Sequence, residues 1–344
     1  MVLELRSITQ PEQWTQFLQQ HPYNYFLQTW QWSEFQNQGL GKPVYRLGFY
    51  DNEKLVGLAL AIVETTRFGQ FVYIPRGPVI DWSNSQLVPP ALSALINFFA
   101  RKNYFQLRLE PLVLLAQSEV VKQLTEFGFR TAIKAIQVEL AWVLDLNQTE
   151  ADLLKNMRKN TRYYIKRGQK LGLTVEFSTS EEDFSWFISL LQQASRRKGF
   201  LVAEANYLQQ EFSFLKGEVL QLALAKWQGQ PVAGALLAYY GQEASYLHAA
   251  MIDDQEKLEP SYYLQWECIR KAKSLGLAKY NFWGVVSDQN YHPGHPGYGY
   301  SNFKKGFGGR LEVYLKPQDY VYSWLPYWLF CAQEWYRQKR DQVV

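Results

Sequence analysis

The most constraining feature of this sequence is that its two halves repeat one order of predicted elements. In each half, apolar and turn residues predict helices, an antiparallel hairpin, a further strand, a helix and a last strand. The hairpin turns correspond, at residues 51–53 and 228–230, and a proline, Pro90 or Pro260, precedes the next helix in each half. A repeat of roughly 170 residues is too long for a solenoid unit. The 344 residues therefore predict two copies of one mixed α/β domain.

The individual elements follow from hydrophobic periodicity and from the residues that end helices and form turns. In the first half the sequence predicts helices over 11–19, 30–38, 92–102 and 119–127, and strands over 44–50, 55–62, 71–74, 106–109 and 137–145. In the second half it predicts helices over 150–172, 184–198 and 261–275, and strands over 220–227, 231–240, 246–252 and 279–282. The segment after Gly284 is expected to lack regular structure, because it contains Pro293, Pro296 and several glycines.

This order of elements is that of the GNAT acyltransferase fold, so two tandem GNAT-like domains with mixed sheets are predicted. An order of elements is a fold analogy and carries no activity by itself. The turn that CoA-binding GNAT enzymes place before a helix for the pyrophosphate, Arg/Gln-x-x-Gly-x-Gly/Ala, does not occur in the sequence. Its absence argues against acetyl-CoA as a substrate.

The histidines and cysteines do not indicate a cofactor. His292 and His295 lie in a Pro-Gly segment without a neighbouring cysteine, whereas a metal site needs three or four ligands. Cys268 lies between apolar residues and is expected in the core. Cys268 and Cys331 are the two cysteines of the chain, so no disulfide framework is predicted and a reducing compartment fits. We therefore expect neither a metal nor another cofactor.

Charge and hydropathy favour a cytoplasmic protein. The net charge is +4 at pH 7, which implies nucleic-acid binding only where the cations cluster. The N-terminus lacks the apolar segment of a signal peptide. The longest apolar run, residues 321–332, is interrupted by Pro326 and is too short to span a bilayer.

An aromatic and basic helix is predicted near the C-terminus. Its aromatic residues and cations are Trp324, Trp328, Phe330, Trp335, Arg337, Lys339 and Arg340. Packing of this helix against the body of the protein is the simpler interpretation. Peripheral contact with the inner face of the membrane is the alternative.

A cluster of cations occupies the start of the second half. Residues 155–170 hold seven cations and no acid. Spacings of three and four residues place five of them on one face of the predicted helix: Lys155, Lys159, Arg162, Lys166 and Lys170. A solvated face normally intersperses acids among its cations. The cluster therefore fits contact with a nucleotide diphosphate or an RNA backbone, with a plain solvated face as the alternative.

The segment 303–309, Phe-Lys-Lys-Gly-Phe-Gly-Gly, places two lysines between aromatic residues and beside glycines. Glycines allow a ligand to approach the backbone closely, and lysines there would bind an anion. Phe303 and Phe307 would anchor the segment, which favours a site role for Lys304 and Lys305 over that of ordinary surface lysines.

Six segments, in order along nearly the whole chain, carry a family resemblance. They are residues 26–32 (Phe-Leu-Gln-Thr-Trp-Gln-Trp), 73–79 (Tyr-Ile-Pro-Arg-Gly-Pro-Val), 108–111 (Arg-Leu-Glu-Pro), 159–165 (Lys-Asn-Thr-Arg-Tyr-Tyr-Ile), 280–284 (Tyr-Asn-Phe-Trp-Gly) and 303–309. Together they resemble the Fem family of peptidoglycan interpeptide-bridge aminoacyltransferases. No heptad insert occurs, so the chain looks like the compact kind without a coiled-coil arm.

The resemblance implies substrates and a domain plan. The donor would be aminoacyl-tRNA, and the acceptor UDP-MurNAc-pentapeptide or its lipid-linked form. The family has two tandem GNAT-like domains, and its C-terminal segment returns to the first. We therefore expect one domain over 1–146, completed by 317–344, and a second over 147–316. A monomer is expected.

The resemblance also implies roles for individual residues. Lys304, with Phe303 beside it, matches a lysine thought to hold phosphate or developing negative charge near the tRNA acceptor end. Arg196 falls where the family has an arginine that touches the precursor, whereas Phe200 lacks the hydroxyl of the family's tyrosine. Glu110 stands where the family often has Asp and is a further predicted substrate contact.

Further substrate contacts follow from the matched segments. Gln36 stands where the family often has a lysine for the phosphates of the precursor. Gln36 has no charge, so either Arg76 or another cation takes the place of that lysine, or the precursor differs. The remaining predicted contacts are Lys159, Arg162, Lys305 and Trp283.

The chemistry of such a transfer needs little beyond positioning, because an aminoacyl ester is already activated. The attacking amine must lose its proton first, which costs about 4–5 kcal/mol at pH 7 for a pKa of about 10.4. Lys304 and Arg162 would lower this cost by like-charge repulsion and would stabilise a tetrahedral oxyanion. Tyr262, which opens the helix before the site strand together with Tyr263, is a candidate for passing a proton to the leaving ribose hydroxyl.

Two other functions stay open at this point. One is an N-acyltransferase that uses acyl-CoA on another amine. The other is a non-enzymatic pair of domains that binds cell-wall precursor at the membrane. Ribonuclease would stop only a tRNA-dependent transfer, and the non-enzymatic protein would show no turnover with any charged tRNA.

Overall fold

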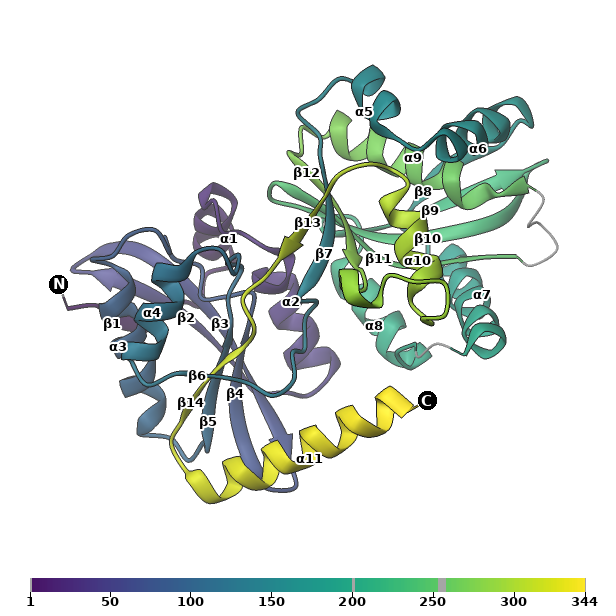
Figure 1. Ribbon diagram of the computed structural model, residues 1–344. Helices are drawn as coiled ribbons and strands as arrows, with labels where there is room; N and C mark the ends of the chain where they lie inside the picture. Colours follow the sequence, from purple (N-terminus) through teal and green to yellow (C-terminus); the bar gives the residue numbers. More distant parts are fainter. Residues whose placement is uncertain (1, 200–201, 253–257, 344) are drawn as a thin grey trace. The chain divides into compact units, whose positions relative to one another are not determined.

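The computed structural model describes residues 2–199, 202–252 and 258–343. The chain forms two compact units (Figure 1), of which unit 1 consists of Met1–Glu139 and Val313–Val344, and unit 2 of Leu140–Glu312. Each unit has a seven-stranded mixed sheet with helices packed on it. These bounds differ by a few residues from those expected, since the strand at Leu140–Asp145 belongs to the second sheet.

The sheet of unit 1 has the strand order β1-β2-β3-β4-β5-β14-β6. Its strands are β1 (Glu4–Ser7), β2 (Val44–Asp51), β3 (Lys54–Thr66), β4 (Gly69–Pro75), β5 (Gln106–Glu110), β6 (Arg130–Thr131) and β14 (Gln318–Val321). Its helices are α1 (Pro11–Gln20), α2 (Trp30–Glu34), α3 (Val88–Ala100), α4 (Ser118–Glu126) and α11 (Trp324–Val343), with a 3-10 turn at Phe26–Gln28 and a π turn at Phe35–Gly39.

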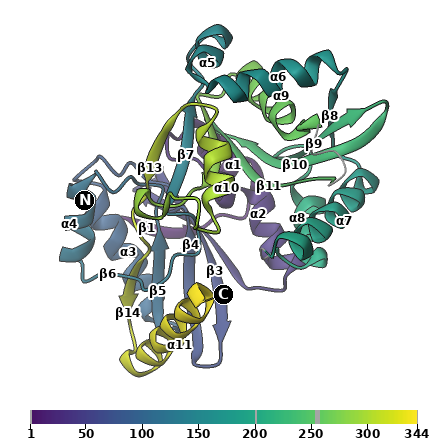
Figure 2. The same cartoon turned by 45° about the vertical axis from the view of Figure 1, so that its right-hand side comes forward.

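The strands of unit 1 present alternate residues to two different layers, as the two-residue period of a strand requires. The core formed with α3 and α4 contains Val72, Ile74, Leu107 and Leu109. The layer formed with α11 contains Phe71, Tyr73, Phe105, Tyr327 and Phe330. In both views α11 runs along this second face of the sheet (Figures 1 and 2). Arg108 and Glu110, which alternate with the first set, therefore belong to the α11 face.

The sheet of unit 2 has the strand order β13-β7-β12-β11-β10-β9-β8. Its strands are β7 (Leu140–Asp145), β8 (Thr174–Ser178), β9 (Leu220–Trp227), β10 (Gln230–Tyr240), β11 (Glu243–Met251), β12 (Lys279–Gly284) and β13 (Arg310–Val313). Its helices are α5 (Glu150–Asn156), α6 (Lys159–Lys170), α7 (Glu181–Lys198), α8 (Ala205–Leu215), α9 (Pro260–Ser274) and α10 (Tyr298–Lys305), with a 3-10 turn at Asp288–Asn290.

Helices cover both faces of the second sheet. Apolar residues of α5, α6 and α9 share one core with alternate strand residues, and buried Cys268 is part of it, as predicted. Phe187 of α7 packs on the opposite face at Gly234, and α7 stacks on α8 through Phe184 and Phe212, with ring centres 3.9 Å apart. Helix α6 approaches α9 closely at Gly168, because this residue has no side chain. A Cβ there would lie 2.8 Å from Cβ of Tyr263.

The two sheets repeat one pattern of strand directions. Four antiparallel strands, β1 to β4, precede the parallel pair β4–β5 in unit 1, and β8 to β11 precede the parallel pair β11–β12 in unit 2. An antiparallel strand then follows in each, β14 beside β5 and β7 beside β12. The hairpin turns also correspond, with φ of 54° at Asn52 and 51° at Gln228. The predicted duplication of a mixed α/β domain is thus confirmed.

The helix predicted over 150–172 is two helices in the structure. The backbone is extended at Met157 and Arg158, with ψ of 154° and 150°. Tertiary contacts hold this break, because the Arg158 N–H donates to the Gly306 carbonyl at 2.9 Å. Lys155 therefore lies on α5 and does not continue the basic face of α6, which corrects the predicted five-cation face.

The prediction that the segment after Gly284 lacks regular structure is wrong for Tyr298–Lys305, which forms α10. Pro293 and Pro296 precede this helix and interrupt none of its hydrogen bonds. Gly299 lies inside it and costs about 1 kcal/mol relative to alanine. Packing of Phe303 in an aromatic cluster offsets that cost.

Candidate active site

The parallel strands β11 and β12 diverge after three paired residues each, Glu243–Ser245 and Lys279–Asn281, although both strands continue. The pairing of β12 with β7 shifts register between Asn281 and Gly284, and Trp283 in this bulge has φ of 67°. The Asn281 Oδ1 accepts a hydrogen bond from the Trp283 N–H at 2.8 Å. The bulge shifts the register of β12 against β7, and the pairing resumes with Gly284 opposite Ala141.

The Lys304 amine contacts the end of β12 that follows this bulge. Its Nζ donates to the Gly284 carbonyl at 2.7 Å. It lies 6.0 Å from the ring centre of Tyr246 on β11 and 5.1 Å from that of Tyr300 on α10. Burial lowers the pKa of Lys304 from 10.5 to about 7, because the ammonium loses hydration. At neutral pH both protonation states of this amine are therefore populated.

An aromatic cluster holds α10 in place. Tyr262 of α9 stacks on Tyr164 of α6, with ring centres 4.9 Å apart, and meets Phe303 at 4.9 Å and Phe307 at 5.9 Å. Phe307 packs in turn on Phe282 of β12 at 5.3 Å. The structure thus brings together Phe303 and Tyr262, two of the predicted catalytic residues. Burial raises the pKa of Tyr262, so its hydroxyl stays protonated at neutral pH and is able to donate a proton.

The partners of Lys305 differ from those of Lys304. Its Nζ lies 3.3 Å from Asp288 Oδ1 and 3.9 Å from the ring centre of Tyr291. Arg158 reaches the same group, because it donates hydrogen bonds to the Asn302 side chain and, at 3.1 Å, to the Tyr291 hydroxyl. The result is a cationic pair around one tyrosine. Sequence reasoning did not single out Arg158, Asn302 or Tyr291, and the presence of Arg158 in the basic run was the one signal for them.

Helix α6 carries the predicted basic face in a shortened form. Lys159, Lys166 and Lys170 are exposed, and α6 contains no acid. Arg162 differs, because its Nη1 donates to carbonyls at the end of α5, those of Leu154, Lys155 and Met157. Arg162 therefore satisfies the C-terminal carbonyls of α5. Its contact with a substrate stays a prediction, as does that of Lys159.

Two further predicted contacts are Arg196 on α7 and Trp283 on β12. Arg196 is exposed in the last turn of α7, which ends at Gly199 with φ of 71°. Phe200, its predicted neighbour, lies outside the described residues. Trp283 is half-buried in the bulge of β12. Substrate contacts of Arg196 and Trp283 stay predictions.

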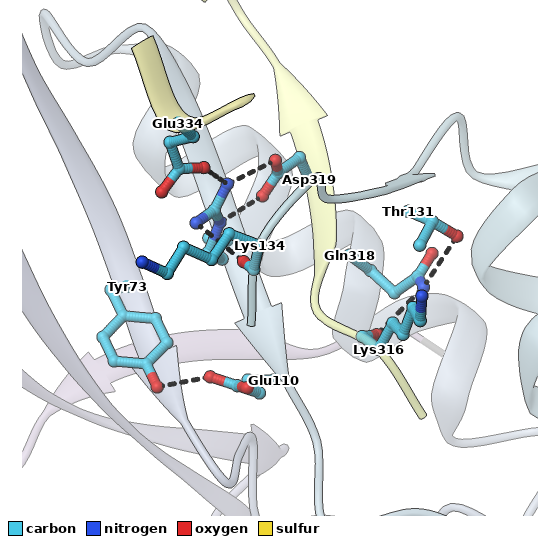
Figure 3. A network of polar contacts seen from close by, with 9 residues as sticks. Tyr73, Glu110, Thr131, Lys134, Lys316, Gln318, Asp319 and Glu334 are labelled. Carbon is cyan, nitrogen blue, oxygen red and sulfur yellow. Dashed lines mark hydrogen bonds and ion pairs between the residues drawn. The ribbon is translucent and has the colours of Figure 1, made fainter. Parts of the chain in front are cut away.

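Glu110 in unit 1 is buried in a polar network on the α11 face (Figure 3). Its Oε2 accepts a hydrogen bond from the Tyr73 hydroxyl at 2.5 Å, and its Oε1 accepts one from the Gln137 backbone N–H at 2.9 Å. Burial and the Glu110 charge raise the pKa of Tyr73, so this hydroxyl remains a donor. Both Glu110 oxygens therefore have donors within the protein, and its contact with a substrate stays a prediction.

Arg76, the other predicted contact in unit 1, is 2% exposed. Its Nη2 donates to the Val138 carbonyl at 2.7 Å, and its guanidinium lies 4.5 Å from the ring centre of Tyr314. Its Nε has no hydrogen-bond partner in the described part of the chain. An unused donor on a buried cation suits an anionic oxygen. Gln36, which stands where the family often has a lysine, is 3% exposed.

Histidines and acids do not gather into a metal-binding set in the ranges that the structure describes. No group of three or more His, Cys, Asp or Glu side chains there is placed to hold a metal ion. The rings of His292 and His295 lie 6.0 Å apart, and the His295 Nδ1 accepts a hydrogen bond from the Gly297 N–H at 3.0 Å. His295 thus serves to order the segment that leads into α10.

The sequence and the fold of this chain are similar to those of known proteins. The sequence model of the FemAB family matches residues 9–228, and that of a GNAT acetyltransferase domain matches residues 155–305. Lipid II:glycine glycyltransferase of Staphylococcus saprophyticus is 23% identical over 377 aligned residues, covering 89% of this chain and 90% of that protein. A solved structure of FemX matches with a TM-score of 0.83 at 20% identity, covering 92% of this chain and 97% of FemX. A tandem GNAT protein from the clavulanic acid biosynthesis pathway matches with a TM-score of 0.54 at 10% identity, covering 93% and 99%.

These likenesses separate fold from family. The two solved structures share few identical residues with this chain, so they establish the fold, and they confirm the predicted tandem GNAT-like architecture. The FemAB model matches well over half of the chain, including four of the six segments that carried the resemblance. The chain therefore belongs to the FemAB family.

Proposed function

We propose that this protein transfers an aminoacyl group from aminoacyl-tRNA to an amine of a peptidoglycan-precursor stem peptide. Membership of the FemAB family supports this activity, and one relative is named for glycine transfer to lipid II. The observation that carries the proposal is the Lys304 amine, which is held at the end of β12 with a pKa of about 7. The acceptor would be UDP-MurNAc-pentapeptide or its lipid-linked form.

In the proposed reaction, a neutral amine of the stem peptide attacks the ester carbonyl of the aminoacyl-tRNA. A C–N bond forms, the ester C–O bond breaks, and the ribose hydroxyl leaves. In its protonated form, Lys304 would stabilise the negative charge that develops on the carbonyl oxygen. Its hydrogen bond to the Gly284 carbonyl fixes the direction of the amine, so little reorganisation is needed when the charge appears.

Proton transfer is the second requirement of this reaction. The attacking nitrogen must lose a proton, and the leaving ribose oxygen must gain one. Tyr262 is the proposed relay, because its ring packs on Phe303, the residue before Lys304, and its raised pKa keeps the hydroxyl protonated at neutral pH.

The donor is proposed to bind unit 2 through its cations. Lys159, Lys166 and Lys170 expose three ammonium groups along one face of α6, and α6 carries no acid that would neutralise them. A phosphate backbone is the ligand that such a face fits. Arg158 and Lys305, which both contact Tyr291, would bind a further phosphate of the donor.

The decisive experiment offers the purified protein a mixture of charged tRNAs together with either acceptor, UDP-MurNAc-pentapeptide or the lipid-linked precursor. We expect an acceptor extended by an aminoacyl group through an amide bond. Pretreatment of the donor with ribonuclease should abolish the product. Product formation that persists after this treatment would contradict tRNA dependence, and no product with any charged tRNA and either acceptor would contradict the proposed function.

A second candidate is N-acyl transfer from acyl-CoA to another amine. The match of a GNAT acetyltransferase model to residues 155–305 favours it. The same assay separates the two functions, since transfer from acetyl-CoA would proceed without tRNA and would not respond to ribonuclease.

A further inference from the structure

The outward side of α11 is apolar along most of its length. Exposed fractions are 47% for Trp324, 73% for Leu325, 56% for Trp328, 46% for Leu329, 51% for Trp335 and 67% for Tyr336. We refer to these six side chains as the aromatic face of α11. Single exposed apolar residues are normal on a protein surface, but a continuous group of this size marks a surface that binds something.

The helix cannot hide this face by turning about its axis. Its opposite side packs on the sheet of unit 1, where Tyr327, Phe330 and Cys331 share a buried cluster with Phe71, Tyr73 and Phe105. Glu334, on the same inward side, pairs with Nη2 of Arg108 at 3.2 Å (Figure 3). Rolling α11 would expose this cluster and would remove an acid from a buried cation, so the aromatic face is fixed outward.

We propose that the aromatic face of α11 binds the interface of a lipid bilayer, with the helix axis lying in the membrane plane. Tryptophan and tyrosine are the side chains that prefer the boundary between headgroups and acyl chains. No described helix is long and apolar enough to cross a membrane. An amphipathic helix of this composition instead inserts one side into the interface.

The charges around the aromatic face favour a membrane over a second copy of the protein. Glu334 is the only charged residue from 324 to 336 in the sequence, and it points inward. Cations flank the face, because the Arg130 guanidinium lies 4.4 Å from the ring centre of Trp324 and exposed Arg337 follows Tyr336. Anionic headgroups would attract these cations. Two such faces packed on each other in an isologous dimer would bring like charges together.

The purpose of this membrane contact rests on the proposed function, because a lipid-linked acceptor would be presented at a bilayer surface. Binding itself needs no substrate. It can therefore be measured on the full chain with vesicles alone, apart from any transfer assay.

The test is flotation of the protein with vesicles of phosphatidylcholine, with and without phosphatidylglycerol. We expect the wild-type chain to float with vesicles, more so when phosphatidylglycerol is present. The double variant L325S/L329S should lower the bound fraction about tenfold. The matched control is L115S/L275S, which removes two leucines of similar exposure, 51% and 49%, outside α11. The control should float like the wild-type chain.

Three outcomes would overturn the proposal: no flotation of the wild-type chain, equal flotation of L325S/L329S, or a dimer in light scattering that this variant dissociates. The single variant Trp328→Ser gives a second readout, and circular dichroism verifies the fold of each variant. If transfer fails while flotation persists, the proposed function falls and the membrane contact stands.

Discussion

Arg108 on β5 and Asp319 on β14 form a two-pronged ion pair, with Nε to Oδ1 at 2.7 Å and Nη2 to Oδ2 at 2.9 Å (Figure 3). Both side chains are 0% exposed. The two residues lie 211 positions apart in the sequence, so the pair ties the C-terminal segment to the first unit. β5 also carries Glu110, so this ion pair and the Tyr73–Glu110 contact link three neighbouring strands, β4, β5 and β14, in the interior of the sheet.

The first prediction concerns this pair. Arg108→Met leaves the Asp319 carboxylate buried without its main partner, and we expect it to lower the free energy of unfolding by about 3–5 kcal/mol. The double variant R108M/D319L removes both charges and should recover most of this loss. Lys226→Met breaks an exposed pair with Glu176 and should cost less than about 1 kcal/mol. Urea unfolding measures all three, and a loss for Arg108→Met no larger than that of Lys226→Met would contradict the buried pair.

The second prediction concerns the donor. The triple variant K159Q/K166Q/K170Q should weaken tRNA binding and reduce the slope of log K against log salt by about 2–3. The physical reason is that fewer counterions are released from the RNA when fewer phosphates are neutralised. The control K54Q/R101Q/K122Q removes three exposed cations of unit 1 and should leave the slope unchanged. Equal slopes for the wild-type chain and both variants would show that α6 does not contact RNA.

The third prediction is that Lys304→Met lowers the rate of aminoacyl transfer by about 10²-fold or more while the fold persists. Removal of the amine leaves the developing oxyanion without its proposed positive partner. Lys305→Met, which changes the adjacent lysine, should reduce transfer less and act mainly on the KM for tRNA. Initial rates with charged tRNA measure both variants, and unchanged turnover in Lys304→Met would exclude the assigned role.

The fourth prediction concerns the proton relay. Tyr262→Phe keeps the ring stacked on Tyr164 and Phe303 and removes only the hydroxyl. We expect kcat to fall by about 10²-fold with little change in KM. Tyr164→Phe is the matched control on the partner ring and should leave kcat near the wild-type value. A Tyr262→Phe enzyme with wild-type kcat would mean that another group delivers the proton.

The repeat and the hairpins were predictable because their signals are local. Turn residues at 51–53 and 228–230 and the alternation of apolar residues predict both hairpins, and the structure has both, with left-handed residues at Asn52 and Gln228. The pairing of β14 with β5 has no such local signal. Nothing in the sequence near Asp319 shows that its partner is Arg108, since their contact depends on the complete sheet.

The two lysines of α10 illustrate what the sequence left open. Lys304 and Lys305 look equivalent between Phe303 and Phe307, because the segment was expected to be irregular. In a helix, neighbouring residues point about 100° apart. Lys304 therefore reaches the Gly284 carbonyl, whereas Lys305 pairs with Asp288. The matched family motif favoured Lys304 for catalysis, and the helix gives the two residues different surroundings.

The last prediction follows from the pKa of Lys304. Its folded value, about 7, lies below the ordinary value of 10.5, so between these values the unfolded chain binds a proton that the folded chain does not. Stability then rises with pH through this window and is lost again as pH falls toward 7. From pH 7 to pH 9 we expect the wild-type chain to gain about 2 kcal/mol relative to Lys304→Met.

Other groups that titrate between pH 7 and pH 9 contribute equally to both proteins, so the comparison isolates this amine. Lys305→Met controls for the loss of a lysine from α10. Urea unfolding at several pH values gives the free energies. If the curves of the wild-type chain and Lys304→Met run parallel across the window, the amine is not desolvated in the folded protein. A pKa of about 7 for Lys304 would then be wrong, whatever effect Lys304→Met has on aminoacyl transfer.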